Sequence, residues 1–454
     1  MSPLTLINDQ PIGENNPFEN EGLGFTTYAQ VLGEAILNTA TPFTIGVFGE
    51  WGTGKTSLMR MLEKNIHETA KDDAVLIWFN AWQYEKEENL IVPLIAHIIN
   101  ELEKQKTFLK AFEDGGKKII LALRAIAYGF SSKVKVSFPG VAEIETTVVG
   151  KDVIDREEKL APKATLEKSL YYDAFETLSK IKIGKKKRIV IIIDDLDRCF
   201  PDKTIELLEN IKLVLSQQGF IFVLGVSRYV IEGYLKYRYE ELYGLKNFDG
   251  RSYFDKIVQL PFYIPPHDSR MKSFSNSILA RLDEKNRESL EEMLDIIGSA
   301  CKNNPRSIIR FVNNLLIDQA INKALVAEGI FDREIEIGYF AITRSLQQNW
   351  SDLFTELIES DQLCKAIAQL HEQGEIEAMA ALGLNQATVE LDIQKHMGDV
   401  ARRMVSNKDL SSLLMSSVGK EWLLNDDLRR GAVEFLIKQR ITNRLEVDVN
   451  DNVS

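Results

Sequence analysis

A glycine-rich turn between an apolar segment and a helix is the feature that most restricts the fold of this chain. The apolar run 43–48 is followed by the sequence GEWGTGKTS at residues 49–57, which fits the pattern G-x-x-x-x-G-K-[ST]. Residues 58–66 continue with the composition of a helix. Glycines in such a turn let backbone N–H groups close around a phosphate without interference from Cβ atoms. The sequence therefore predicts a strand, a phosphate-binding turn and a helix in succession.

All nine residues of this turn are predicted to bind a nucleotide. They are Gly49, Glu50, Trp51, Gly52, Thr53, Gly54, Lys55, Thr56 and Ser57. Lys55 is expected to reach the β- and γ-phosphate oxygens and to act in catalysis, and the Thr56 hydroxyl is expected to ligate Mg²⁺. The pattern thus predicts a site for a nucleoside triphosphate with Mg²⁺. The pattern is compatible with ATP and with GTP.

A second candidate half of the site lies far downstream. Residues 189–193 are a continuous β-branched run, typical of a buried parallel strand, and Asp194 and Asp195 follow it directly. Ligands of parallel sheets bind beyond the carboxyl ends of the strands, so these acids can face the glycine-rich turn. We expect Asp194 to hold Mg²⁺, directly or through water, and Asp195 to orient or polarise the attacking water. The alternative is that these acids only cap a helix over 201–215.

Two further strand ends carry candidate residues. The apolar run 220–226 ends at Ser227, which is a candidate sensor of the γ-phosphate, with capping of the next helix as the alternative. A segment with two tryptophans follows the strand-like residues 74–77. These tryptophans could simply pack in the core, whereas Asn80 and Trp82 are candidates for a supporting role beside the site.

The composition is that of a globular protein. The chain has 454 residues, 44% of them hydrophobic, which is enough for two or three domains. A net charge of −12 argues against a protein built mainly to coat nucleic acid, although a local basic groove stays open. Three widely separated cysteines predict neither a disulfide framework nor a metal cluster. Residues 1–20 lack the pattern of a secretory signal and no run is long enough to span a bilayer, so we expect a cytoplasmic protein.

Four further segments make the pattern specific to one family. They are FNAW at 79–82, DDLDRC at 194–199, YFDKIVQLPF at 253–262 and NPRSIIRFVN at 304–313. Together with the glycine-rich turn, and in this order, they resemble the KAP family of P-loop NTPases from about residue 20 to about residue 325. The resemblance implies an α/β fold of the ASCE or AAA+ type, with a parallel sheet flanked by helices and an extra strand between the Walker A and Walker B elements. At the strand end where family members often have an acid, this chain has Ser227.

The resemblance also implies roles for arginines. Arg306 and Arg310 lie one helical turn apart, so both could face a phosphate from a helical lid, and one of them is expected to sense the nucleotide. Arg198, Arg228 and Arg251 are the candidates for acting on the γ-phosphate of a neighbouring subunit. For each arginine, a surface salt bridge is the alternative.

The same patterns predict four parts of the chain. They are an N-terminal arm over 1–20, an NTPase core over 21–265, a helical lid over 266–329 and an α-helical domain for oligomer or partner contact over 330–454. Family members frequently carry transmembrane helices between the two Walker elements. Here the insertion 105–165 instead contains a mixed apolar helix and a possible β-hairpin, with an amphipathic anchor on a membrane surface as the alternative.

By resemblance, the expected function is Mg-dependent ATP hydrolysis that drives a conformational change in a homo-oligomer or a bound effector. Because bacterial KAP proteins are often implicated in defence against phage, an antiviral defence complex is the expected context. The C-terminal helices are the expected docking site for an effector protein. The alternative is a nucleotide-dependent switch or scaffold with little turnover. A third interpretation, remodelling of nucleic acid, is disfavoured because no basic or aromatic-interleaved stripe is present.

Overall fold

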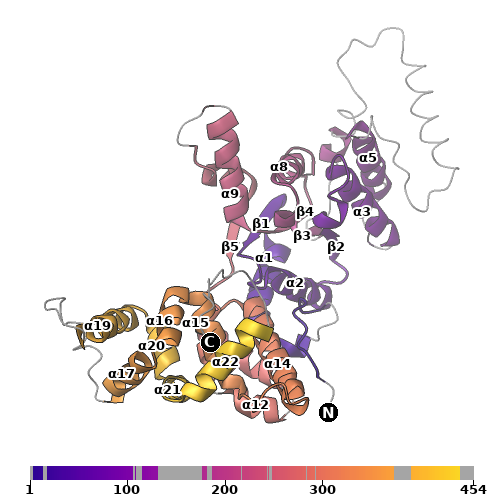
Figure 1. The fold of residues 1–454 in the computed structure, drawn as a ribbon. Coiled ribbons are helices and arrows are strands. Elements are labelled where there is room, and N and C mark those ends of the chain that lie inside the picture. Colours follow the sequence, from indigo (N-terminus) through magenta and orange to yellow (C-terminus); the bar gives the residue numbers. More distant parts are fainter. Residues whose placement is uncertain are drawn as a thin grey trace, which may run out of the picture. The chain divides into compact units, whose positions relative to one another are not determined.

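The computed structural model describes residues 4–13, 18–105, 108, 115–130, 176–180, 187–215, 217–242, 244, 248–282, 284–291, 293–372 and 390–439. The chain divides into two compact units (Figure 1). We call Pro11–Glu19 with Gly24–Pro265 the sheet unit, and Met1–Gln10, Asn20–Leu23 and Pro266–Ser454 the helical unit. The β-hairpin predicted within the insertion 105–165 lies outside the described residues.

Five strands form the sheet. They are β1 (Phe43–Phe48), β2 (Ala74–Asn80), β3 (Arg188–Asp194), β4 (Phe220–Val226) and β5 (Leu260–Tyr263). Their order is β2-β3-β4-β1-β5, and every neighbouring pair is parallel. β4 therefore lies between β1, which leads into the glycine-rich turn, and β3, which ends in the acidic residues. This order confirms the predicted parallel α/β fold with an extra strand between the two halves of the site.

Helices flank this sheet (Figure 1). They are α1 (Phe25–Asn38), α2 (Lys55–Thr69), α3 (Ile91–Lys104), α5 (Gly115–Phe130), α8 (Pro201–Asn210), α9 (Arg228–Tyr237) and α10 (Arg251–Ile257), with the 3₁₀ turns η1 (Phe18–Asn20), η2 (Ala81–Tyr84) and η3 (Leu196–Arg198) and the π-helical turns η4 (Ile211–Leu215) and η5 (Arg238–Leu242). Ile191 of β3 shares a core with α3, α5 and α8. Successive strand residues face opposite sides of a sheet, so Ile192 points away from that core. Helix α2 packs on α1 and contacts β2 and β4. Both faces of the sheet are thus covered, which explains why β3 and β4 are buried along their whole length.

The helical unit consists of helices in the described part of the chain. They are η6 (Asp268–Arg270), α11 (Met271–Leu279), α12 (Glu284–Glu291), α13 (Leu294–Ala300), α14 (Pro305–Ala327), α15 (Ile337–Asn349), α16 (Ser351–Glu359), α17 (Asp361–Glu372), α19 (Glu390–Ser406), α20 (Lys408–Met415), α21 (Ser417–Leu424) and α22 (Asp426–Gln439). α13 contacts α15 and α20. Helices from the predicted lid and from the predicted C-terminal domain therefore pack together in this unit.

The longest of these helices, α14, begins at a well-defined cap. The Asn304 side chain accepts a hydrogen bond from Ser307 N at 3.2 Å, and Pro305 occupies the first helical position, where its missing N–H has no cost. Further along the helix, Asn313 holds the N-terminal segment: its Oδ1 accepts from Ile7 N at 2.8 Å and its Nδ2 donates to Ile7 O at 2.7 Å. The N-terminal segment is therefore fixed along α14.

The last part of α14 is anchored to the following helix. Asp318, which is fully buried, pairs with Arg344 of α15 through two contacts, of 2.5 and 3.0 Å. One turn later, Asn322 Oδ1 accepts a hydrogen bond from Ile335 N at 2.7 Å, just before α15 begins. Buried polar groups that are paired in this way fix the packing of one helix on the next.

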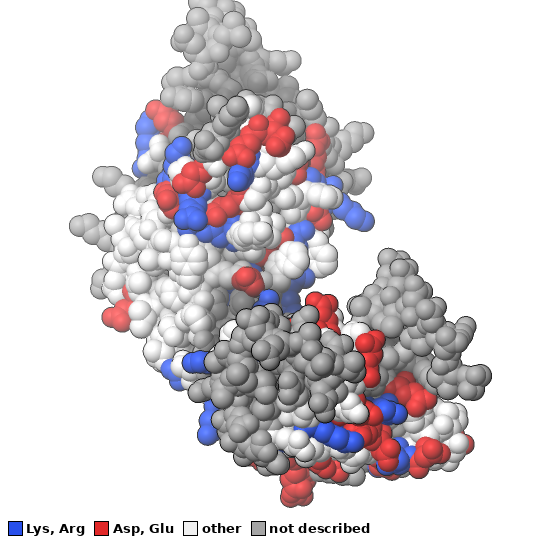
Figure 2. All heavy atoms as spheres, turned by 60° about the vertical axis from the view of Figure 1, so that its left-hand side comes forward, with Lys and Arg blue, Asp and Glu red and all other residues white. Residues whose placement is uncertain are grey.

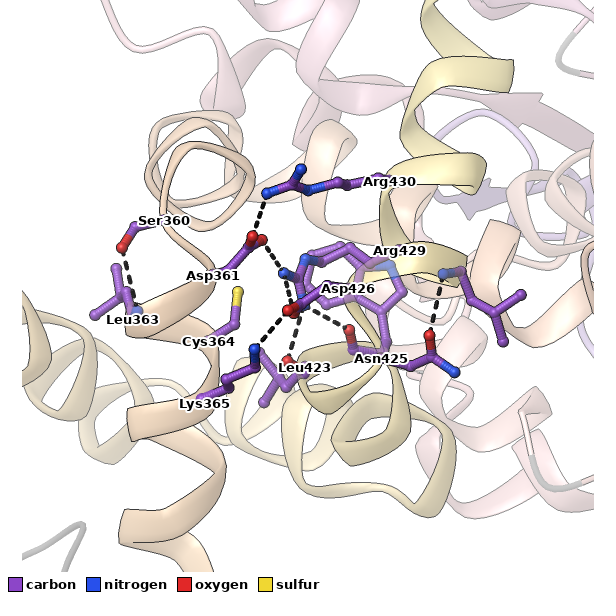
Figure 3. Close-up of polar contacts among 12 residues, drawn as sticks. Ser360, Asp361, Leu363, Cys364, Lys365, Leu423, Asn425, Asp426, Arg429 and Arg430 are labelled. Carbon is purple, nitrogen blue, oxygen red and sulfur yellow. Dashed lines mark hydrogen bonds and ion pairs between the residues drawn. The ribbon is translucent and has the colours of Figure 1, made fainter.

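A cluster of charged residues joins α17, α21 and α22 (Figure 3). Arg429 is 1% exposed, and its guanidinium donates to Trp422 O at 3.1 Å, to Leu423 O at 2.8 Å and to Asp426 Oδ1 at 2.8 Å. It also pairs with Asp361, which binds Arg430 with its other oxygen. Asp426 in addition binds Lys365 at 2.5 Å. We call these five charged residues, Asp361, Lys365, Asp426, Arg429 and Arg430, the helical cluster.

Charges of both signs are interspersed on one face of the molecule (Figure 2). On the face that Figure 2 presents, Lys and Arg side chains lie beside Asp and Glu side chains, and the described residues form no continuous basic stripe there. None of the described helices is long and apolar enough to cross a membrane.

Candidate functional site

The glycine-rich turn connects β1 to α2. Gly52 and Gly54 have φ angles of 84° and 99°, a region that residues with a Cβ rarely adopt, so the glycines at these positions are required by the backbone. Thr53 Oγ1 donates to Glu50 O at 2.8 Å and closes the turn upon itself. α2 begins at Lys55, so its unpaired N–H groups and the positive end of its dipole face the turn. This part of the chain can bind an anion.

Lys55 is held by three oxygen atoms. Its Nζ donates to Gly49 O at 2.9 Å and to Glu50 O at 3.2 Å, and it lies 3.2 Å from Asp197 Oδ2. The residue is only 9% exposed. The ammonium group is thus held within the turn by contacts with the protein itself.

Asp194 ends β3 and is almost completely buried. Burial, together with the neighbouring Asp195 carboxylate, raises its pKa to about 6, although hydrogen bonds from the Thr56 side chain and from Asp195 N oppose this shift. The hydroxyl of Thr56 and the carboxyl of Asp194 are therefore in contact. Both are hard oxygen donors of the kind that Mg²⁺ prefers, and a bound cation would favour the charged carboxylate. The two residues predicted to hold Mg²⁺ fit that ion.

Asp195 has an unusual backbone and two well-defined partners. Its φ and ψ of 57° and 28° lie in the left-handed region, which turns the chain at the end of β3. Oδ1 pairs with Arg198 Nε at 2.8 Å, and Oδ2 accepts a hydrogen bond from Asn80 Nδ2 at 3.0 Å. Burial raises the pKa of this carboxyl, while Arg198 and Asn80 lower it. Asp195 is therefore oriented by two side chains beside the glycine-rich turn.

The partners of Asp195 come from neighbouring segments. Asn80 ends β2, where the register places it opposite Asp194, and its Oδ1 accepts from Trp82 N at 3.1 Å, so one side chain caps η2 and orients Asp195. The Arg198 guanidinium lies over the Trp82 ring, 5.2 Å from its centre. Of the two aromatic-segment candidates, Asn80 contacts the site directly and Trp82 supports it through Arg198.

Asp197 is the residue that sequence reasoning missed. It was part of the DDLDRC segment but received no role. In the structure it is buried, and its Oδ2 contacts Lys55 Nζ at 3.2 Å, Trp51 Nε1 at 3.0 Å and Ser227 N at 2.9 Å. The available signal was its spacing: a third acid just after the pair at the strand end can turn back to the same site.

Ser227, Arg228 and Arg251 lie at or after the end of β4, and their contacts differ. Ser227 precedes α9 at the N-cap position, yet its side chain makes no capping hydrogen bond, which disfavours the capping alternative. Arg228 pairs with Glu232, contacts Tyr263 OH at 2.5 Å and is 15% exposed in its side chain. Arg228 also donates a long hydrogen bond of 3.4 Å to the backbone carbonyl of Arg251, whose own side chain is exposed. Arg228 is thus engaged within its own unit.

Arg306 and Arg310 belong to the helical unit. In its first turns α14 presents both to Asp9, whose Oδ2 lies 2.9 Å from Arg310 Nε and 3.8 Å from Arg306 Nε. The structure therefore brings a set of predicted residues together in the sheet unit: Lys55, Thr56, Asn80, Asp194, Asp195, Arg198 and Ser227. Arg306 and Arg310 instead have a partner in the helical unit.

Comparison with known proteins gives a family match. The KAP family P-loop domain matches residues 25–322. An uncharacterized protein of Methanocaldococcus jannaschii is 30% identical over 174 residues, which cover 33% of this chain and 88% of that protein. The phage T7 exclusion protein of Escherichia coli is 23% identical over 315 residues, which cover 64% of this chain and 41% of the exclusion protein. The chain thus spans less than half the length of that second relative.

Among solved structures, the ORC2 protein of Aeropyrum pernix in its ADPNP–ADP complexes aligns with a TM-score of 0.33 at 12% identity. The alignment covers 90% of this chain and 94% of that one.

Proposed function

The chain belongs to the KAP family of P-loop NTPases, and on that premise we propose that it binds ATP with Mg²⁺ and hydrolyses it to drive a conformational change in an oligomer or a bound effector. One observation carries the proposal. Lys55, at the start of α2, and the carboxylates of Asp194 and Asp195, at the end of β3, converge beside one glycine-rich turn. Cation, metal ligand and water-orienting carboxylate are the parts that phosphoryl transfer to water requires.

Each part has a defined role in this reaction. The N–H groups of the turn and Lys55 bind the β- and γ-phosphate oxygens, and Thr56 and Asp194 hold the ion. Mg²⁺, when bound, supplies positive charge that offsets the phosphate oxygens. Asp195 orients the attacking water and accepts its proton. Its partners Asn80 and Arg198 keep the carboxylate in one orientation, and its burial makes it a better proton acceptor than an exposed aspartate.

The experiment compares phosphate release from ATP and Mg²⁺ by the full chain and two variants, over a range of protein concentrations. Lys55→Ala and Asp195→Asn are each expected to lower turnover by about 100-fold or more, and Asp195→Asn should still bind ATP. Asp352→Asn, an exposed acid in the first turn of α16, is the matched control and should keep full activity. Turnover that survives in both site variants would refute the proposal. A specific activity that rises with concentration would support an oligomer.

A second candidate function, a nucleotide-dependent switch with little turnover, is favoured by one feature. Both carboxylate oxygens of Asp195 are already engaged, one by Arg198 and one by Asn80. Each oxygen keeps a free lone pair, but the two partners restrict the directions from which a water can approach the carboxylate. ATP binding without measurable phosphate release by the native chain would select this function over hydrolysis.

We also propose that the protein acts in defence against phage, and that the helical unit docks the effector. The support is the similarity to a phage T7 exclusion protein, at 23% identity over 64% of this chain. Phage should form fewer plaques on cells that produce the native chain than on cells that produce the Lys55→Ala variant. Equal plaque counts across a broad phage panel would count against this context.

A further inference from the structure

Asp197 has no part in the reaction described above, although it lies at the centre of the site. Its side chain is 2% exposed. A carboxylate is costly to bury unless it is paired and hydrogen-bonded. Asp197 meets both conditions through one oxygen, which contacts the Lys55 ammonium, the Trp51 indole N–H and the backbone N–H of Ser227. These three donors come from the glycine-rich turn, from α2 and from the end of β4.

The pairing with Lys55 matters because an ammonium group has three N–H donors. Two of them donate to Gly49 O and Glu50 O, which belong to the turn itself, and the ammonium group also forms an ion pair with Asp197 Oδ2 at 3.2 Å. A bound phosphate needs at least one of these donors. The carbonyl oxygens carry only partial charge, whereas Asp197 carries a full negative charge in a buried position. Asp197 is therefore the strongest competitor for the lysine.

We propose that Asp197 is a positioning residue that competes with the β- and γ-phosphates for Lys55, and thereby sets how tightly the turn holds a nucleotide. The inference rests on the proposed nucleotide binding. When Lys55 turns to the phosphates, the N–H groups of Trp51 and Ser227 still hold the Asp197 carboxylate. The charge therefore stays in place and repels the nucleotide, so that affinity for nucleotide is kept below the value that Lys55 alone would give.

The test is the affinity of the full chain for ATP, ADP and AMP, measured by calorimetry in EDTA so that Mg²⁺ does not contribute. Asp197→Asn keeps the shape of the side chain and can still accept from Trp51 and Ser227, but it has no charge to hold Lys55. We expect its Kd for ATP and for ADP to fall about fivefold to tenfold, equal to about 1 to 1.4 kcal/mol. AMP has no β-phosphate for Lys55 to bind, so its Kd should stay within about twofold.

Two comparisons separate this role from a structural one. Asp195→Asn also removes a negative charge from the site, but Asp195 forms its ion pair with Arg198 and acts on Lys55 only from a longer range, so its Kd for ADP should change less than that of Asp197→Asn. A purely structural Asp197 predicts weaker binding together with a lower melting temperature. Unchanged or weaker binding of ADP by Asp197→Asn, or an equal gain for AMP, would overturn the proposal.

A second variant covers the case in which Asp197→Asn does not fold. Trp51 is 59% exposed, so Trp51→Phe should fold, and it removes one N–H donor from Asp197. The carboxylate should then attract Lys55 more strongly, and the Kd for ADP should rise about twofold. A fall or no change would contradict the inference. If neither the native chain nor any variant binds nucleotide, the proposed function itself fails, which is a different outcome from binding that is insensitive to Asp197.

Discussion

Two groups of charged residues, one in each unit, balance their charges in opposite ways. The sheet unit places the acids Asp194, Asp195 and Asp197 with the cations Lys55 and Arg198, so that acids are in excess. The helical cluster places the acids Asp361 and Asp426 with the cations Lys365, Arg429 and Arg430, so that cations are in excess. In the first group the pKa of Asp194 is raised to about 6 by burial. In the second, the hydrogen bond from Lys365 and the contacts with Arg429 lower the pKa of Asp426.

This difference separates charged groups that hold the fold together from charged groups that are available to bind a ligand. Each acid of the helical cluster has cationic partners within the fold, so the cluster is complete and holds helices together. In the part of the chain that the structure describes, no Lys or Arg side chain forms an ion pair with Asp194. A buried carboxylate in that position is unfavourable for folding, and a cation from outside the chain would offset its cost. Three changes test this contrast.

The largest expected effect is on the helical cluster. Arg429→Met keeps the apolar stem but removes the guanidinium, which takes one cationic partner from Asp361 and from Asp426 and leaves the carbonyls of Trp422 and Leu423 without this donor. We expect the free energy of unfolding of the helical unit to fall by about 3 to 5 kcal/mol. Urea unfolding of the full chain measures it. Arg430→Met is the matched control: Arg430 binds the same Asp361 but is 68% exposed, so its loss should cost less than about 1 kcal/mol. Equal losses would contradict the architectural role of Arg429.

The second prediction is a gain in stability, caused by the removal of the buried charge of Asp194. The pKa of Asp194 is about 6 in the fold, whereas its ordinary value is 3.8. Between these values the unfolded chain has released its proton and the folded chain has not, so the free energy of unfolding falls as pH rises through this window. Above about pH 6 the whole penalty is present, and Asp194→Asn should therefore stabilise the protein at pH 7 by about 2 to 3 kcal/mol.

Urea unfolding at pH 7 and at pH 4, without Mg²⁺, tests this sign, and the gain should be largely absent at pH 4. Asp426→Asn is the control from the other group. Because the pKa of Asp426 is lowered in the fold, its ionised form stabilises the protein at pH 7, and the substitution should lower stability there. A loss of stability in both variants would remove the contrast between the two groups.

The smallest expected effect is on kcat and comes from the side chain that orients Asp195. Asn80→Ala removes the amide that holds Asp195 Oδ2 while leaving the carboxylate in place. We expect kcat for ATP to fall about tenfold, or about 1.4 kcal/mol, with KM nearly unchanged, because the hydrogen bond to a charged group is lost together with the cap on Trp82 N. Steady-state phosphate release measures both constants. Asn349→Ala removes an amide that donates to Ser345 O in α15, in the helical unit, and it should leave kcat unchanged. A change in KM alone would show that Asn80 acts on binding.

Much of the sheet unit could be predicted because its signals are local. Positive φ angles require the glycines of the turn, and a continuous β-branched run produces the buried strand β3. The meeting of Thr56 with Asp194 follows from the rule that parallel strands place their carboxyl ends at one edge. Asn80 was a candidate because it follows a strand-like segment, and the structure adds that β2 pairs with β3.

The rest could not be predicted because it depends on backbone turns and on distant partners. The spacing of Asp197 shows that it lies near the strand end, but its contacts depend on Asp195, whose left-handed φ of 57° is uncommon for a residue with a Cβ. The pairing of Arg429 with Asp361 joins residues that are 68 positions apart, which no periodicity reveals. The roles predicted for Arg198, Arg306 and Arg310 stay predictions, since their partners in the structure are Asp195 and Asp9.

Helix α14 has a mechanical consequence. Its 23 residues form a rod about 34 Å long at about 1.5 Å per residue. Asp9 contacts the first turns through Arg306 and Arg310, and the final turns hold Ile335 and Arg344. A helix that tilts as a rigid body by about 10° around its first turn moves its far end by about 6 Å. The helix is therefore a lever arm: a small displacement of the group that Arg306 and Arg310 bind would produce a larger displacement where α14 contacts α15.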